Sequence, residues 1–287
     1  MKILITGKNS YIGNSVKSWL NLKEPSYLVD DISLRNKDLK TISFKNYDVI
    51  FHIAGIAHIT SKKKMVDGYF RINRDLAIEV AKKAKEEGVK HFIFTSSMAI
   101  YGDDRSIGDF RPIEVDKPSP NNAYSQSKLE ADLYIQKLQD GSFDVSVIRM
   151  PLVYGKFSKG NFLKLVNLSK RITIFPAVKN IRSILHINNL SELVRLIILN
   201  RLKGLFFPQD EKYFSTNNFI FKMRSSIGKK TIFIPFLSFP LSLLGLFIKP
   251  IQKIYGNKYY EITQSSILNL NYQLFSVEDF IKELNNI

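Results

Sequence analysis

The chain has 287 residues, 45% of them hydrophobic, and no cysteine. A chain of this size can bury a large core, and the lack of cysteine excludes disulfides, thiolate metal sites and a cysteine nucleophile. The formal net charge of +16 is spread along the chain, which favours solvated faces over a nucleic-acid-binding patch. Its first residues read as a strand, which leaves no room for a signal peptide. We therefore expect a globular cytoplasmic protein that binds no nucleic acid.

Short β-branched runs alternate with helical stretches through the first half of the chain. We expect strands at Lys2–Thr6, Tyr27–Val29, Ile32–Leu34, Val49–Ile53, Phe92–Ser96 and Val145–Arg149. We expect helices at Tyr11–Asn21, Met65–Glu87 and Ala123–Gln139. This alternation predicts an α/β fold with a doubly wound, mostly parallel sheet. Residues 1–150 should form that domain and residues 151–287 mainly a smaller lobe, with a segment near residues 180–200 returning to the sheet.

A glycine loop follows the first predicted strand and opens the first predicted helix. Gly7 permits a tight turn, Gly13 lets helix and strand approach closely, and Ser10 stands where a middle glycine is usual. The free N–H groups at the helix start can bind a pyrophosphate, and we assign Tyr11 and Ile12 to the same site. The context predicts a Rossmann dinucleotide site.

Three further features bear on the dinucleotide. Asp30 and Asp31 close the second strand, where a carboxylate can accept both ribose hydroxyls of NAD and repel the 2′-phosphate of NADP. Lys8 favours the opposite choice, because it can neutralise that phosphate, so NADH and NADPH both stay open. The small residues of Ile53-Ala54-Gly55 at the end of a strand allow close approach to the adenine ribose.

Tyr124 and Lys128 are the strongest candidates for chemistry. Of the 13 tyrosines, only Tyr124 has a lysine four residues later, and it follows Ser97 by 27 residues. Positions i and i+4 share a helix face, so the phenol and the ammonium point into one site. The ammonium should lower the pKa of Tyr124 and make it a usable acid or base. Ser97, at a strand end, can hydrogen-bond the same reacting oxygen.

Several motifs recur in a characteristic order. They are the glycine loop, HIAG, Ile72-Asn-Arg-Asp-Leu76, FTSSMAIYG, YSQSK, RMPLVYG with GNF, and Arg182-SILHINNL. In this order the motifs resemble the extended short-chain dehydrogenase/reductases, a group of nucleotide-sugar epimerases, dehydratases and ketoreductases.

The resemblance implies a role for individual residues. Ser97, Tyr124 and Lys128 match the catalytic triad, Asn73 a helix residue near the cofactor, and Pro151 the nicotinamide side. For a UDP-sugar substrate, the resemblance implies that Asn161 and Phe162 cover the nucleotide, Phe175 lies against the base, and Arg182 pairs with the diphosphate. The family's Asp after that Arg is Ser183 here.

Two absences narrow the expected reaction. The 4,6-dehydratases that the chain resembles need an Asp-Glu pair where it has Met98 and Ala99, and a Cys–His epimerase-reductase needs cysteine. We favour reduction, with NADH or NADPH, of the C4 ketone of a UDP-linked 4-keto-6-deoxy-N-acetylhexosamine for a surface polysaccharide such as capsule or O-antigen. The alternatives are a UDP-hexose or UDP-N-acetylhexosamine 4-epimerase and a non-catalytic dinucleotide-binding regulator. A homodimer is left open.

Two other features complete the expectations. His52, His58, His91 and His186 lack metal-ligand spacing, so we expect no metal site, and only His58 should lie near the catalytic site. The apolar segment Ile232–Ile248 contains Pro235 and Pro240, which disfavours a spanning helix. We expect a buried or surface-docking helix there, with peripheral membrane contact as the less favoured alternative.

Overall fold

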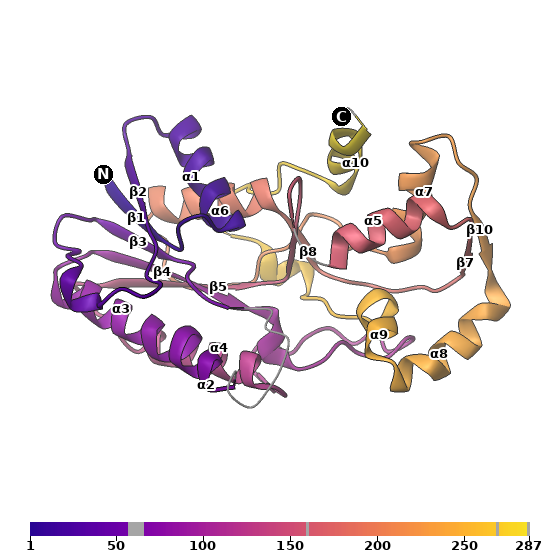
Figure 1. Cartoon of the computed structure of the whole chain (residues 1–287), viewed down its shortest axis with the longest axis horizontal. Coiled ribbons are helices and arrows are strands. Elements are labelled where there is room, and N and C mark those ends of the chain that lie inside the picture. Colours follow the sequence, from indigo (N-terminus) through magenta and orange to yellow (C-terminus); the bar gives the residue numbers. More distant parts are fainter. Residues whose placement is uncertain (57–65, 159–160, 268–269, 286–287) are drawn as a thin grey trace.

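The computed structural model describes residues 1–56, 66–158, 161–267 and 270–285. Its centre is a six-stranded parallel sheet (Figure 1). In spatial order the strands are β2 (Leu28–Ile32), β1 (Lys2–Thr6), β3 (Val49–His52), β4 (His91–Ser97), β5 (Asp144–Met150) and β9 (Gly204–Phe206). Most inner strands are continuous apolar runs, as strands covered on both faces must be. The predicted α/β class with a mostly parallel sheet is confirmed.

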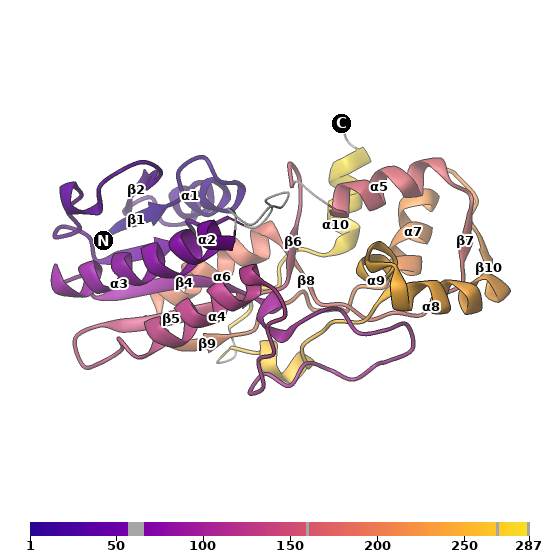
Figure 2. The same cartoon turned by 60° about the horizontal axis from the view of Figure 1, so that its bottom comes forward.

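Helices cover both faces of this sheet. Helices α1 (Tyr11–Lys23) and α6 (Ile187–Leu199) pack together on one face, and α3 (Leu76–Glu86) and α4 (Ala123–Gln136) pack on the other (Figures 1 and 2). Successive side chains of β1 point to opposite faces of the sheet, so they enter two hydrophobic cores, one under each layer of helices. Ile3 and Ile5 join the α1 and α6 side, whereas Leu4 joins the α3 and α4 side.

Two predicted elements differ from the structure. The runs Tyr27–Val29 and Ile32–Leu34 are one strand, β2, because Leu28 to Ile32 pair without interruption with β1. The predicted helix Met65–Glu87 is divided into α2 (Val66–Tyr69), the π-helical η3 (Phe70–Asp75) and α3. Short π-helical segments often mark functional sites, and η3 holds the buried Asn73.

The strand order creates a crevice beside β1. From β1 the chain crosses to β2 on one side, and β3 lies on the other. The connections that leave the carboxyl ends of β1 and β3 therefore diverge, which is where ligands bind in open α/β sheets.

The remaining elements form a second lobe, at the right of Figure 1. They are the strands β6 (Leu152–Tyr154), β7 (Ile174–Pro176), β8 (Ile184–His186) and β10 (Ile232–Ile234), and the helices α5 (Asn161–Arg171), α7 (Thr216–Ser225), α8 (Ser238–Phe247), α9 (Lys249–Tyr255) and α10 (Val277–Asn285). Short 3₁₀ turns in the described ranges include η1 (Leu39–Thr41), η4 (Met98–Tyr101), η5 (Pro235–Leu237) and η6 (Ile262–Ser265). No helix within the described ranges is long and apolar enough to cross a bilayer.

Candidate active site

The crevice beside β1 is a cleft whose floor is the glycine loop. Gly7 has φ 120°, and a Cβ there would lie 2.8 Å from Ile53 Cγ2. At Gly13 a Cβ would lie 2.6 Å from Ser10 Oγ, which accepts a hydrogen bond from the Gly13 N–H. The N–H groups of Tyr11 and Ile12, the first two of α1, have no partner within the helix, so they are available to an anion. The loop therefore fits a dinucleotide pyrophosphate.

The opposite wall of the cleft is the turn after β3. Ile53, Ala54 and Gly55 line it as predicted. Asn73 does not line the cleft but holds this turn from η3, because its side chain accepts from the Ile56 N–H at 2.8 Å and donates to the Ile56 oxygen at 3.0 Å. Asn73 thus acts on the cleft through the backbone that it positions.

Asp30 and Asp31 do not lie in the cleft. Both residues lie within β2, which continues to Ile32, so the strand does not end at them. Asp31 forms an ion pair with Lys17 of α1, and Asp30 accepts a hydrogen bond from the Tyr47 hydroxyl at 2.8 Å. The prediction that they bind the ribose is corrected on this geometry.

Basic side chains take the place expected for those carboxylates. The residues just beyond β2 line the cleft, together with Lys8: they are Ser33, Leu34, Arg35, Asn36 and Lys37. Lys8 and Arg35 belong to the loops that follow β1 and β2. This end of the cleft is therefore suited to an anionic group.

The glycine-loop side chains Tyr11 and Ile12 point to different places. Ile12 lines the catalytic pocket described below. The Tyr11 hydroxyl is buried beside Gly155, where an added Cβ would lie 2.8 Å away, and it has no hydrogen-bond partner among the described residues. Packing against the α1 and α6 core turns this ring away from the cleft, so only the Tyr11 backbone is placed to bind the cofactor.

Ser97, Tyr124 and Lys128 converge between the cofactor cleft and a second pocket. Ser97 ends β4, and Tyr124 lies in the first turn of α4, which Asn122 caps by accepting from the Ser125 N–H at 3.0 Å. Ser97 and Tyr124 line the second pocket. Lys128 reaches towards the first cleft, since a Cβ at Gly55 would lie 3.5 Å from its Nζ.

The pKa values of the pair are set mainly by burial. Burial raises the pKa of Tyr124, and a hydrogen bond with Ser97 partly offsets the rise. Burial also lowers the pKa of Lys128 to about 8, although Asp132 opposes that fall. The Lys128 ammonium donates to the Thr95 oxygen at 2.9 Å. The expected lowering of the Tyr124 pKa by Lys128 is thus not seen: desolvation dominates, and Lys128 is not among the groups that shift this pKa.

The second pocket, which we call the catalytic pocket, has a volume of about 710 Å³ and a basic lining. Pro151 and Arg182 line it. Its charged residues are Arg182, Lys249, Lys253 and Lys258 against Asp103 and Asp104. Arg182 pairs with Asp104 at 3.0 Å, and the Lys258 ammonium donates to the Gly102 oxygen. Sequence reasoning missed the three lysines as site residues, because no motif connects them with Ser97.

Two predicted substrate residues are core residues instead. Phe162 is buried among aromatic rings of the second lobe, with Tyr154 at 4.8 Å and Phe219 at 5.2 Å between ring centroids. Phe175 is buried on β7 against Phe233. Both rings complete the apolar centre of the lobe and leave no face for a nucleotide. Asn161 begins α5, and its side chain lies outside the description.

The described histidines are structural. His52 and His91 are buried, and burial lowers their pKa to about 3 and about 4. His52 pairs with the Thr6 hydroxyl at 2.8 Å and His91 with the Ser146 hydroxyl at 2.7 Å. His58 lies outside the described residues. Within the described part of the chain, no three His, Asp or Glu side chains gather as metal ligands would.

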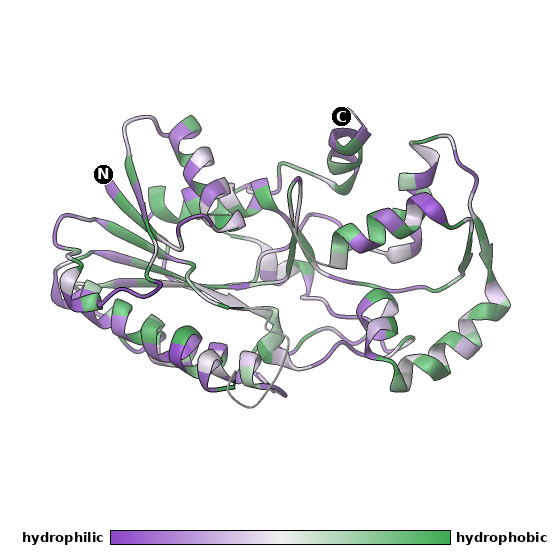
Figure 3. Cartoon of the chain, viewed as in Figure 1, coloured by the Kyte–Doolittle hydropathy of each residue, from purple (hydrophilic) through white to green (hydrophobic). Residues whose placement is uncertain are grey.

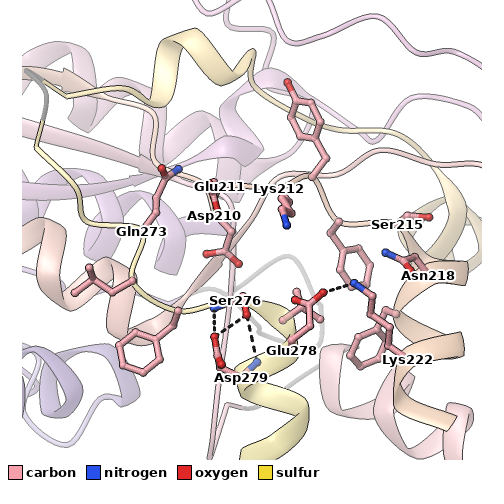
Figure 4. Close-up of a pocket in the computed structure, with 16 residues that line it drawn as sticks. Asp210, Glu211, Lys212, Ser215, Asn218, Lys222, Gln273, Ser276, Glu278 and Asp279 are labelled. Carbon is pink, nitrogen blue, oxygen red and sulfur yellow. Dashed lines mark hydrogen bonds and ion pairs between the residues drawn. The ribbon is translucent and has the colours of Figure 1, made fainter. Parts of the chain in front are cut away.

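A further hollow lies between α7, α10 and the loop after β9 (Figure 4). Two of its carboxylates have partners within the hollow: Lys222 pairs with Glu278, and the Ser276 hydroxyl donates to Asp279 at 2.6 Å. Burial raises the pKa of Asp210 there to about 6, and the carboxylate accepts from the Tyr154 hydroxyl at 2.7 Å. Of these contacts, the Lys222–Glu278 ion pair joins α7 to α10.

Comparison with known proteins identifies the family and several relatives of this chain. Residues 3–205 match the model of the NAD dependent epimerase/dehydratase family. The chain belongs to this family. A UDP-glucose 4-epimerase of Vibrio cholerae is 30% identical over 257 residues, which are 81% of this chain and 78% of that protein. An N-acetyl-alpha-D-glucosaminyl-diphospho-ditrans,octacis-undecaprenol 4-epimerase of Escherichia coli O157:H7 is 28% identical over 204 residues, or 67% of this chain and 59% of that protein.

Solved structures share the fold of the family. A UDP-glucuronic acid 4-epimerase from Bacillus cereus, solved with UDP-glucuronic acid and NAD, matches 98% of this chain and 97% of its own with TM-score 0.72 and 18% identity. A dTDP-4-dehydrorhamnose reductase from Clostridium acetobutylicum matches with TM-score 0.71, 20% identity and coverage of 99% and 100%. The predicted family and a nicotinamide dinucleotide as its cofactor are confirmed, with NADH and NADPH both open.

Proposed function

We propose that this protein is a 4-epimerase of a hexose carried on UDP. The placement of Ser97, Tyr124 and Lys128 where the cofactor cleft meets a basic pocket supports hydride transfer at a sugar carbon, and the choice of epimerisation rests on the relatives. The Vibrio cholerae relative, a UDP-glucose 4-epimerase, supports the reaction type. Epimerisation is thus preferred to reduction here, whereas the sequence alone favoured a single reduction.

The proposed chemistry begins with a proton at the sugar C4 oxygen. When bound, the nicotinamide would supply a hydride acceptor and donor. Tyr124 takes the proton of the C4 hydroxyl and returns it, and Ser97 holds the same oxygen by a hydrogen bond. Lys128, buried beside Gly55, binds the cofactor ribose. No acid stands at Met98 or Ala99 to eliminate water.

The basic lining of the catalytic pocket fits a diphosphate. Four cationic and two acidic side chains give it a formal surplus of two positive charges, which matches the charge of a diphosphate diester. Arg182 can offer its planar fork to the phosphate oxygens while Asp104 holds the guanidinium in place. The carrier is proposed to be UDP. A lipid-linked sugar diphosphate, like the one in the name of the Escherichia coli relative, is the second carrier to test.

Reduction of a 4-keto sugar is the second candidate reaction. It needs the same three residues and likewise no acid after Ser97, so the geometry supports it as far as it supports epimerisation. Its substrate class would be a UDP-linked 4-keto-6-deoxy-N-acetylhexosamine of surface-polysaccharide synthesis.

Two incubations of the purified protein separate these reactions. An epimerase should interconvert UDP-glucose and UDP-galactose, or their N-acetylamino counterparts, by NMR with no net loss of reduced nicotinamide. A reductase should consume NADH or NADPH stoichiometrically with the keto sugar and leave the hexoses unchanged. Activity on neither substrate, in protein shown to bind the cofactor, would overturn the proposal.

Tyr124→Phe tests the catalytic assignment itself. The change removes only the hydroxyl and keeps the ring packed against Tyr69, at 5.9 Å between centroids. Turnover should fall by about 10²–10⁴-fold, the usual contribution of general acid–base catalysis, while the cofactor Kd stays unchanged. A variant that is folded, binds cofactor and turns over at the normal rate would exclude Tyr124 from the chemistry.

A further inference from the structure

Helix α8 lies at the outer edge of the second lobe and contains many hydrophobic residues (Figures 1 and 3). Together with η5 it carries an exposed apolar stripe. Its large side chains are Phe236, Phe239, Leu243, Leu244, Phe247 and Ile248, and their exposed fractions run from 40% to 85%. Phe239, Leu243 and Phe247 are spaced four residues apart, so they share one helix face. Contiguous apolar surfaces of this kind mark sites of contact with a partner or a membrane.

The charge around the stripe indicates the kind of partner. Between Glu211 and Glu261 the sequence contains no Asp or Glu, and it contains eight Lys or Arg. Four of these lysines are exposed next to the stripe in sequence: Lys229 and Lys230 before it, and Lys249 and Lys253 after it. An apolar helix face flanked by lysines is the pattern of a helix that lies in the interface of an anionic bilayer. A second copy of the same basic segment fits this surface less well, because like charges would face each other.

The stripe is also fixed beside the catalytic pocket. Helix α9 follows α8 after Ile248 and contributes Lys249, Gln252 and Lys253 to the pocket lining. The two helices pack closely, since a Cβ at Gly245 of α8 would lie 3.5 Å from Ile251 of α9. A surface that receives α8 would therefore lie next to the pocket.

We infer that α8 docks this protein on an anionic lipid bilayer, with the aromatic side chains Phe236, Phe239 and Phe247 entering the headgroup region and the exposed lysines Lys229 and Lys230 contacting lipid phosphates. The bilayer then lies beside the basic catalytic pocket. The inference does not depend on the reaction proposed above, although it bears on the choice between the two carriers.

Vesicle co-sedimentation of the full chain tests the docking. The protein should bind vesicles of equal parts phosphatidylcholine and phosphatidylglycerol, bind phosphatidylcholine alone weakly, and lose binding as salt rises. The double variant F239Q/F247Q should bind about tenfold or more weakly, because two exposed aromatic anchors are gone. F157Q is the matched control: Phe157 is 78% exposed but lies in the loop after β6, and this variant should bind as the wild type does.

Two further readouts make the result decisive. Turnover of a soluble UDP-sugar should be the same in F239Q/F247Q and wild type, since neither phenylalanine lines the cofactor cleft or the catalytic pocket. No wild-type binding to the anionic vesicles, or equal binding of F239Q/F247Q and F157Q, would overturn the inference and leave the proposed reaction untouched. A wild-type dimer in solution that F239Q/F247Q converts to monomers would also overturn it, by assigning the stripe to a second copy.

Discussion

Lys128 destabilises the fold because its ammonium is buried, although the proposed reaction uses that ammonium. Its side chain is only 6% exposed, its ammonium donates to Thr95 and lies 4.8 Å above the Phe94 ring, and burial lowers its pKa from 10.5 to about 8. A shift of that size corresponds to a destabilisation on the order of 3 kcal/mol at neutral pH. Between the folded and unfolded pKa values the unfolded chain binds more protons, so this destabilisation disappears as pH rises.

Lys128→Met should therefore stabilise the fold while it abolishes turnover. We expect a gain of about 1–3 kcal/mol at pH 7, because a buried charge is removed at the loss of one hydrogen bond. The measurement is urea unfolding of both proteins from pH 7 to pH 10.5. The gap between them should narrow above pH 8, and a gap that stays constant over this range would contradict the assigned pKa.

Arg35 should decide the choice of cofactor. Arg35 and Lys8 line the cleft beyond β2, whereas Asp30 and Asp31 are directed to Tyr47 and Lys17. We expect NADPH to bind more tightly than NADH, and Arg35→Ala to weaken NADPH by about tenfold through loss of a charge-assisted contact. Cofactor fluorescence titration gives both Kd values. R35A should bind NADH as tightly as the wild type does. D31A should keep the wild-type ratio of NADPH to NADH affinity, and a shift of that ratio towards NADPH would mean that the Asp31 carboxylate reaches the ribose.

At the scale of elements, α4 is the part that the site depends on. It presents Tyr124 and Lys128, and its third turn is tied to β5 by a buried ion pair in which Arg149 Nε and Nη2 each lie 3.0 Å from Asp132. Arg149 also donates to the Tyr101 hydroxyl at 2.7 Å. The helix is thus fixed against the sheet by directional contacts as well as by apolar packing.

Asp132→Ala should loosen this attachment. It leaves the Arg149 guanidinium buried without its carboxylate, and losses of this kind destabilise proteins by about 3–5 kcal/mol. Urea unfolding measures the change. The matched control is Glu114→Ala, which breaks the exposed pair with Lys117 and should leave the unfolding midpoint unchanged. Equal midpoints for the two variants would show that the buried pair contributes nothing.

At the scale of the whole molecule, the two halves of the chain share one core. Helix α6 supplies Leu190, Leu193, Val194 and Ile197 to the face of the sheet that α1 covers, and β9 pairs with β5 at the sheet edge. Both come from beyond residue 150. The sheet is therefore completed only after the chain has entered the second lobe and returned.

A fragment of residues 1–150 should consequently fail to fold by itself. Without α6, apolar side chains of β1, β3 and β5 would face water, and each buried aliphatic side chain contributes about 1.5–3 kcal/mol. Thermal unfolding followed by circular dichroism should be cooperative for the full chain and not for the fragment. A sharp fragment transition would instead establish residues 1–150 as an independent domain.

Local sequence determined the parts of this protein that depend on local geometry. The glycine loop after a β-branched run, the four-residue spacing of Tyr124 and Lys128, and the alternation of strands and helices each follow from backbone conformation and side-chain period, which nearby residues control. Those features predicted the α/β sheet, the cleft beside the glycine loop and the placement of Tyr124 and Lys128 on one helix.

Only the tertiary structure decided where the other side chains point. Asp30 and Asp31 are turned from the cleft by strand pairing and by partners on α1 and before β3, and Phe162 is taken into an aromatic core. Lys249 and Lys258 enter the catalytic pocket because α9 and the strand-like segment after it pack beside Arg182. These outcomes depend on contacts between residues that are far apart in the chain. The spacing of residues along one helix or strand does not determine such contacts.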